Sequence, residues 1–205
     1  MNAPIKPPVE FAEATRFLLA LNPSGPWTLT AIRPFSAFGG RRTETLFCTS
    51  IDQVVAFLTE HNGKLNIHLT ANTTKPVLDK PRERDLERLL FVQVDIDKDA
   101  SRVRLTAVTK QRLIGNLKSE EFCKAAGLPG PPTLITDSGN GIQALWRIAD
   151  GGLAATEENI HAVKEMNAFV ITALHGDEGN HSPVQLTRLP GTTNIRSVTK
   201  LKDGE

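Results

Sequence analysis

The acidic pair Asp95 and Asp97 has the clearest potential for chemistry, because it ends the most hydrophobic segment of the chain, residues 89–97. Alternate residues of a strand point to the same face, so the two carboxylates are expected side by side, about 6–7 Å apart. Two such carboxylates repel each other unless a divalent cation neutralises them, and oxygen ligands favour Mg²⁺ or Mn²⁺. An acidic turn at the end of the strand, which includes Asp99, is the alternative, and the pair alone does not decide between the two.

A glycine-containing turn is the second segment of interest, and it separates two apolar runs within residues 133–148. This pattern predicts a β-hairpin. The tip consists of Ser138, Gly139, Asn140 and Gly141. Glycines at such a tip would let backbone N–H groups approach an anion, whereas a simple type I′ turn at Asn140 and Gly141 is the alternative. Trp146, on the second predicted strand, is expected in the core.

The third segment is Arg-Leu-Pro-Gly-Thr-Thr-Asn at residues 188–194. It places the guanidinium of Arg188 beside a predicted tight turn at Pro190 and Gly191, an arrangement that suits a phosphate group. Taken alone, the segment is better explained as a surface turn.

The elements that would position these segments alternate between helical and extended patterns with short connections, which predicts an α/β or α+β fold. Ser50 and Thr156 are suitable N-caps for two of the helices. The expected helices cover residues 7–21, 51–60, 110–126 and 157–174. The expected strands cover residues 27–32, 44–50, 65–69 and 89–97, the hairpin 133–148, and a short strand that ends at the turn at Pro190 and Gly191.

The composition of the 205 residues, with 40% hydrophobic and 23% charged residues, excludes a disordered chain, a collagen and a coiled coil. No apolar run approaches the roughly 20 residues that span a bilayer, and the first ten residues lack the apolar core of a signal peptide, so a cytoplasmic protein is expected. The two cysteines, Cys48 and Cys123, have no CxxC partner, and this argues against a cysteine zinc site and against a disulfide framework.

The net charge of +1 conceals two basic clusters. Six basic residues and one acid lie between Lys98 and Lys118, and four basic residues without an acid lie between Arg188 and Lys202. Such clusters suit a phosphate backbone, although a solvated helix face explains a single cluster equally well.

The three segments together, in this order, resemble the motifs of the archaeo-eukaryotic primase superfamily, and most closely the primase-polymerase domains at the start of phage and plasmid primase-helicase proteins. Residues 89–97 resemble the first motif, residues 137–148 the second and residues 186–194 the end of the third. Residues 67–89 also resemble the strand, asparagine loop and charged helix that precede the acidic strand in that family.

The resemblance implies an α+β fold in which an antiparallel sheet like that of the RNA recognition motif is fused to an N-terminal α/β module, with the active cleft between them. Residues 1–205 would form a single primase-polymerase catalytic domain, with 1–64 in the N-terminal module and 65–200 as the motif-bearing core. The implied activity is nucleotidyl transfer dependent on Mg²⁺ or Mn²⁺, which makes and extends primers on single-stranded DNA in phage or plasmid replication. The implied partners are the DNA template, NTP or dNTP substrates, and a helicase that follows this segment or acts in trans; no membrane is expected.

Site residues follow from the resemblance position by position. The metals would be held by Asp95 and Asp97. The contacts to nucleotide and template phosphates would come from Ser138, Gly139, Asn140, Gly141, Gln143, Arg188, Asn194 and Lys200.

Two departures from the family pattern concern the same site. Many relatives have a histidine where this chain has Gln143. Relatives also place an acid shortly before the arginine of the third region, where this chain has Ser182 and Val184. The nearest acids are Asp177 and Glu178, and we expect Asp177 as the third catalytic and metal-binding residue, because it follows a glycine at a helix end.

Two other classes of protein compete with this interpretation. A catalytically reduced module that binds single-stranded nucleic acid would keep the fold and lose the chemistry. A two-metal nuclease also needs clustered acids, but it leaves the glycine hairpin and the third segment without a role. A rolling-circle endonuclease is disfavoured because the chain has no tyrosine.

Overall fold

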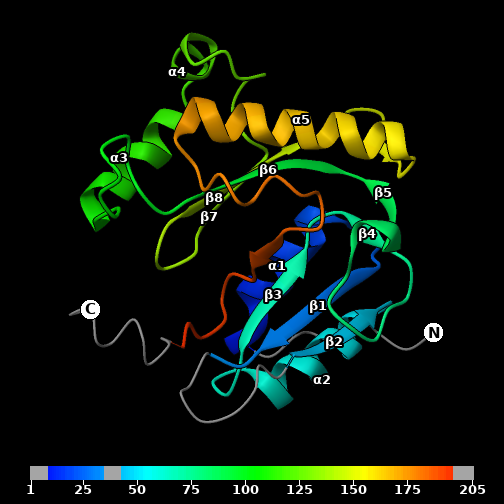
Figure 1. The fold of residues 1–205 in the computed structure, drawn as a ribbon. Helices are drawn as coiled ribbons and strands as arrows, with labels where there is room; N and C mark the ends of the chain where they lie inside the picture. The colour runs from blue at the N-terminus through cyan, green and yellow to red at the C-terminus, as the bar shows by residue number, and fades with distance from the viewer. Residues whose placement is uncertain (1–8, 35–42, 196–205) are drawn as a thin grey trace. The chain divides into compact units, whose positions relative to one another are not determined.

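The computed structural model describes residues 9–34 and 43–195, and the chain divides into two compact units (Figure 1). Unit 1 comprises Met1–Asp85 together with Leu186–Glu205, and unit 2 comprises Leu86–Gln185. The acidic pair and the glycine hairpin therefore lie in unit 2, whereas the segment that begins at Arg188 lies in unit 1. Lys200 falls outside the described residues.

Unit 1 is built on a four-stranded antiparallel sheet with the strand order β10-β3-β1-β2. Its strands are β1 (Trp27–Ile32), β2 (Thr43–Cys48), β3 (Asn66–Thr70) and β10 (Leu186–Arg188). All residues of β1 are buried, so this strand forms the centre of the unit's core, and β2 lies at one edge of the sheet.

Two amphipathic helices complete the core of unit 1, and both are at the positions predicted from their apolar spacing. They are α1 (Ala12–Leu21), preceded by the 3₁₀ helix η1 (Val9–Phe11), and α2 (Ile51–His61). The predicted cap of α2 is confirmed, because the Ser50 side chain accepts a hydrogen bond from the Gln53 amide. The unit also contains β4 (Thr73–Thr74) and the 3₁₀ helix η2 (Glu83–Asp85).

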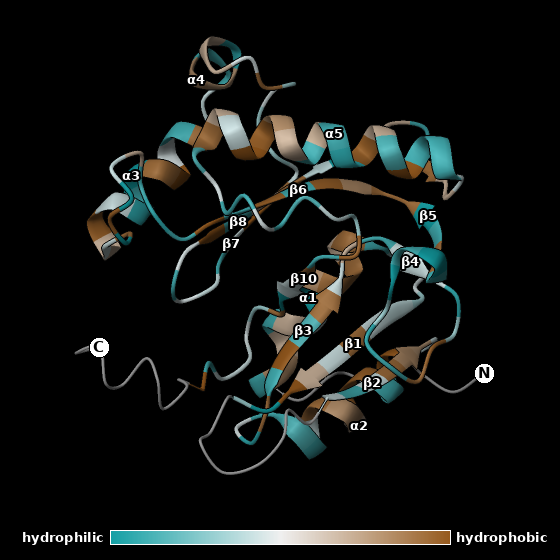
Figure 2. Cartoon of the chain, in the orientation of Figure 1, coloured by the Kyte–Doolittle hydropathy of each residue, from teal (hydrophilic) through white to brown (hydrophobic). Residues whose placement is uncertain are grey.

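Unit 2 is built on a three-stranded antiparallel sheet with the order β6-β8-β7, and helix α5 runs along β6 (Figure 1). The elements are β6 (Phe91–Ile96), β7 (Leu134–Asp137), β8 (Ile142–Arg147) and α5 (Glu157–Leu174), and β5 (Leu86–Leu89) pairs with β9 (Leu153–Ala154). Figure 2 shows β6 brown over most of its length and α5 with alternating brown and teal residues. The core between sheet and helix includes Val94, Ile96, Ile142, Ala144, Trp146, Val170, Ile171 and Leu174.

Most of the elements expected from the sequence are confirmed in unit 2. The hairpin forms, Thr156 caps α5 by accepting a hydrogen bond from the Asn159 amide, and Trp146 is a core residue with 6% exposure. Both units carry antiparallel sheets together with helices, so the α+β class is confirmed.

The helix predicted for residues 110–126 is divided in two, and the charged helix implied by the resemblance is wrong. Residues 110–126 form two helices, α3 (Ala107–Leu117) and α4 (Glu120–Ala125), because the Ser119 side chain accepts a hydrogen bond from the Phe122 amide and begins a new helix. The charged segment before the acidic strand forms η2 and strand β5, in which Leu86 and Leu89 are buried and the two residues between them are exposed.

Within the described ranges, no helix has both the length and the apolar character required to cross a membrane.

Candidate functional site

The acidic pair lies at the end of β6, where Asp95 is paired in register with Gln143 of the neighbouring strand β8. The Gln143 side-chain amide donates a hydrogen bond to Oδ2 of Asp95 at 3.3 Å. The other carboxylate oxygen, Oδ1, is buried and has no hydrogen-bond partner among the residues that the structure describes. A buried carboxylate oxygen without a partner is costly, so this oxygen is an exception that calls for an explanation.

The pKa of Asp95 is raised to about 7, mainly by burial and in addition by the neighbouring carboxylates of Asp97 and Asp177. The hydrogen bond from Gln143 acts in the opposite direction. The structure therefore brings three carboxylates close enough to repel one another, and a bound cation would relieve this repulsion.

Asp177 reaches this position because of the way helix α5 ends. His175 adopts a left-handed conformation with φ 55°, and the Asp177 amide then donates a hydrogen bond to the Asp95 carbonyl at 2.9 Å. Gly176 lies between them and passes so close to β6 that a Cβ at this position would be 2.6 Å from Cγ2 of Val94. The glycine is needed for this close approach, and the approach brings Asp177 to the acidic pair.

The other acid considered from the sequence, Glu178, has a different partner. Its carboxylate forms an ion pair with Arg102, one of the residues of the first basic cluster. Asp177 accepts hydrogen bonds from the Gly179 amide and the Asn180 side chain, and its charge acts on Asp95. Of the two acids, Asp177 has the geometry expected of the third carboxylate; its role as a ligand is a prediction.

The glycine hairpin is fixed by hydrogen bonds within its own loop. The Ser138 amide donates to the Gly141 carbonyl at 2.9 Å, and the Gly141 amide donates to Oγ of Ser138 at 3.0 Å. The Gly139 amide donates to Oδ1 of Asp137. The positive φ of 89° occurs at Gly139 and not at Asn140, so the type I′ turn considered from the sequence does not form.

Gly141 joins the hairpin to the acidic pair. A Cβ at this position would overlap both Oδ1 of Asp97 and the carbonyl oxygen of Ile96. The hairpin and the acidic strand thus pack against each other at a distance that only a glycine allows.

Lys110 is a residue at this site that the sequence did not reveal. It extends from α3, its side chain is 11% exposed, and its ammonium group donates to Oδ1 of Asp137 at 2.7 Å and to the Gly139 carbonyl at 3.1 Å. In the sequence it is one of six basic residues in a cluster, and only the fold of α3 against the hairpin distinguishes it from the others.

The third segment is organised around Asn66 of strand β3. The Arg188 guanidinium donates to the Asn66 side-chain oxygen at 2.8 Å and to that of Asn194 at 3.1 Å, and the Ile195 amide also donates to Asn66. Gly191 has a φ of 71°, which confirms the predicted tight turn. Arg188 and Asn194 therefore contact each other, and Asn66 is a second residue that the sequence did not indicate.

The acidic site is distinct from the pocket of about 620 Å³ in unit 2. The lining of that pocket includes the apolar residues Leu105, Leu113 and Phe122 and the polar or charged residues Lys98, Asp99, Arg112 and His175. None of the predicted site residues lines it.

Comparison with known proteins gives matches at the level of structure. No protein-family model matches the chain, and no curated protein matches its sequence. The solved structures with similar folds include the AEP (archaeo-eukaryotic primase) domain of the cyanophage S-2L primase-polymerase, with a TM-score of 0.56 and 15% identity over 87% of this chain and 81% of that one.

Two structures of the primase RepB′ are also similar, both with a TM-score of 0.54 and 15% identity over 90% of this chain. One is the primase, of which 51% is covered, and the other is its catalytic domain in complex with initiator DNA, of which 78% is covered. At this level of identity the comparisons establish a shared fold.

Proposed function

We propose that this chain, which has the fold of the archaeo-eukaryotic primases, is a primase-polymerase domain that makes and extends primers on single-stranded DNA. The observation that carries the proposal is the convergence of Asp95, Asp97 and Asp177 at the end of β6, with the glycine hairpin packed against Asp97. Acids at a strand end beside a glycine loop provide what nucleotidyl transfer requires: ligands for divalent cations and a nearby support for a triphosphate.

The donor set at this position fits a divalent cation. Oδ1 of Asp95 is buried without a hydrogen-bond partner in the described part of the chain, and the pKa of this residue is raised to about 7 by burial and by its acidic neighbours. Asp95, Asp97 and Asp177 would hold Mg²⁺ or Mn²⁺, which prefer such oxygen ligands. When bound, the cations would supply electrostatic stabilisation to the attacking 3′-hydroxyl and to the departing pyrophosphate.

The protein's own residues orient this site. Gln143 holds Oδ2 of Asp95 and so fixes the rotation of the carboxylate. The hydrogen bonds within the loop set the shape of the hairpin before a nucleotide arrives, and Lys110 adds a cation beside it. We assign the hairpin residues to the incoming triphosphate: Ser138, Gly139, Asn140 and Gly141. Because their geometry is formed in advance, little entropy would be lost on nucleotide binding.

Arg188, Asn194 and Lys200 are assigned to phosphates of the nucleotide or the template. Asn66 holds the guanidinium of Arg188 in place, which supports a positioned phosphate contact over a mobile surface arginine. A sheet like that of the RNA recognition motif, a cleft beside it, a helicase partner and a role in phage or plasmid replication are further parts of this proposal.

A module that only binds single-stranded nucleic acid is the second candidate. Gln143 favours it, because a glutamine stands where many relatives have a histidine, and a neutral amide cannot offer a charged contact to a triphosphate.

Incubation with single-stranded DNA, labelled NTPs or dNTPs, and Mg²⁺ or Mn²⁺ separates the two candidates on a denaturing gel. A primase-polymerase gives a ladder of products that requires both the template and the metal. Binding of the DNA without incorporation of any nucleotide, in either metal, would support the binding module.

A further inference from the structure

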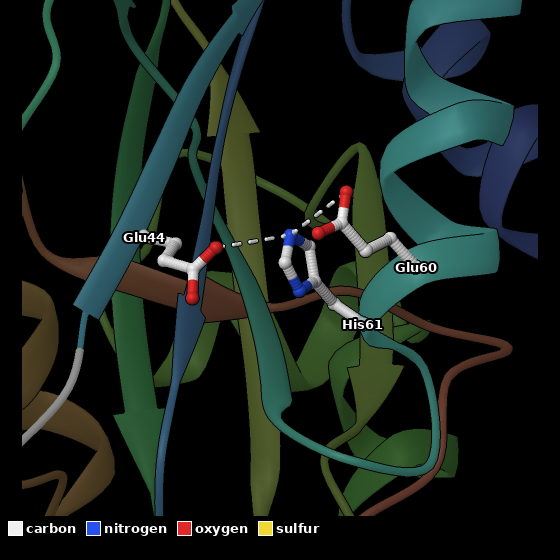
Figure 3. Close-up of side chains that lie close together, drawn as sticks. All are labelled: Glu44, Glu60 and His61. Atoms are coloured by element: carbon white, nitrogen blue, oxygen red, sulfur yellow. Dashed lines mark ion pairs between the residues drawn. The ribbon is translucent and has the colours of Figure 1, made fainter.

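A second group of metal-ligating side chains lies in unit 1, and it consists of Glu44, Glu60 and His61 (Figure 3). One ligand atom of each residue lies within 4.8 Å of the other two. Nε2 of His61 is 3.5 Å from Oε2 of Glu44 and 4.0 Å from Oε2 of Glu60. Three donors from two separate elements, β2 and α2, thus converge on one point.

The imidazole is the fixed member of this group. His61 is 6% exposed at the end of α2, and its ring packs edge-on against Phe57 with 4.5 Å between the ring centroids. The Glu44 side chain is 29% exposed, and the Glu60 side chain is 72% exposed. The imidazole is therefore held by the fold, Glu44 is partly buried beside it, and Glu60 can adjust from the surface.

We propose that Glu44, Glu60 and His61 bind one transition-metal ion of the Zn²⁺ type. One imidazole nitrogen and two carboxylate oxygens are a ligand set that zinc accepts, with water in the fourth position. Ligands bonded to zinc at about 2.0–2.1 Å in a tetrahedron lie roughly 3.3 Å apart, close to the 3.5 Å between His61 and Glu44.

The imidazole makes this site chemically different from the acidic site of unit 2. Nitrogen ligands favour Zn²⁺ and similar ions over Mg²⁺, which prefers an all-oxygen environment. The bound ion would join the C-terminal end of α2 to the edge strand β2. The ion would stabilise unit 1. This zinc site does not depend on whether the chain polymerises nucleotides.

A Zn²⁺ titration by calorimetry, with excess Mg²⁺ to occupy the oxygen sites, tests the proposal on the full chain. We expect one Zn²⁺ ion per chain and a higher melting temperature, both retained when Asp95 and Asp97 are replaced by Asn. Glu44→Gln and Glu60→Gln should each lower the affinity for Zn²⁺ by about 10- to 100-fold or more. A loss of about this size already follows when a residue that only hydrogen-bonds to a metal ligand is replaced.

The matched control is Glu165→Gln in unit 2. Glu165 forms an exposed pair with His161 at 3.3 Å on one face of α5, so this variant loses a similar pair without a third donor and should bind Zn²⁺ as the wild type does. Glu60 is mostly exposed, and Glu60→Gln should fold even if variants of the buried His61 do not.

The main competing arrangement is a protonated His61 that forms ion pairs with both carboxylates. It predicts that the NMR signals of the His61 imidazole do not respond to Zn²⁺. That result, the absence of zinc binding, or an affinity unchanged in both glutamine variants would overturn the proposal.

Discussion

The amide of Asp177 donates a hydrogen bond to the carbonyl oxygen of Asp95, at 2.9 Å. This single backbone contact fixes the end of helix α5 to the end of strand β6. It brings a third carboxylate to a pair that the sequence alone places together, and it explains why the charge of Asp177 contributes to the raised pKa of Asp95.

The first prediction concerns the stability of the metal-free protein against pH. The pKa of Asp95 is about 7 in the folded protein, against 3.8 for the free side chain. Between these values the folded protein binds a proton that the unfolded chain has released, so the free energy of unfolding falls as the pH rises from about 4 to about 7. Asp95→Asn removes this loss and should be more stable than the wild type above pH 7, by up to about 4 kcal/mol.

Chemical denaturation at pH 5 and pH 8 measures this difference. Asp79→Asn, at an exposed position of unit 1, is the control: it keeps Asp95, so its stability should depend on pH in the same way as that of the wild type. Added Mg²⁺ should stabilise the wild type at pH 8 and have little effect on Asp95→Asn. An advantage of Asp95→Asn that is the same at both pH values would show that Asp95 is not protonated near neutral pH.

The second prediction concerns Gly176. A Cβ in Gly176→Ala would contact Val94 at 2.6 Å and the Asp95 carbonyl at 2.9 Å, so the variant should lose about 1–3 kcal/mol of stability and part of its metal affinity. Gly179→Ala is the control, because its Cβ would meet only Oδ1 of Asp177, at 3.6 Å. Equal stability and equal Mn²⁺ affinity of the two variants would mean that the close approach of α5 to β6 is not required.

The sequence predicts elements well where the signal is local. Apolar spacing and the caps Ser50 and Thr156 locate α2 and α5. The hydrophobic run before the acidic pair locates β6, which contains Asp95 and ends one residue before Asp97. The break between α3 and α4 is missed because the apolar pattern continues across Ser119, whose capping hydrogen bond overrides it.

The rest of the candidate site depends on contacts between distant segments. Asp177 reaches Asp95 only because α5 has the right length and Gly176 permits the approach. Lys110 and Asn66 are ordinary polar residues in the sequence, and their importance appears when Asp137 and Arg188 are found beside them. Composition and periodicity carry no information on such pairings.

The third prediction concerns Lys110. Lys110→Met removes the cation that holds Asp137 and the Gly139 carbonyl, and the dissociation constant of the nucleotide should rise about tenfold, which corresponds to one charged hydrogen bond. Binding of single-stranded DNA should change little. Lys118→Met, at the exposed end of α3, removes the same charge and serves as the control; if it weakens nucleotide binding equally, only the general charge of the helix matters.

The fourth prediction concerns the contact between the hairpin and the acidic strand. Gly141→Val should weaken nucleotide binding more than template binding, because its side chain would displace Asp97 and the tip of the hairpin. Gly115→Val on α3 meets no other atom within 4 Å at its Cβ and controls for the general cost of valine. Parallel loss of both affinities in Gly141→Val would indicate misfolding of the unit.

Nucleotide incorporation on single-stranded DNA by a set of carboxamide variants, across a titration of Mn²⁺, tests the three-carboxylate metal site most directly. We expect the wild type and Glu178→Gln to synthesise products, because Glu178 is paired with Arg102. Asp95→Asn, Asp97→Asn and Asp177→Asn should be inactive while remaining folded. Wild-type activity in the double variant Asp95→Ala/Asp97→Ala would contradict the metal site, and wild-type activity in Asp177→Asn at every metal concentration would remove Asp177 from it.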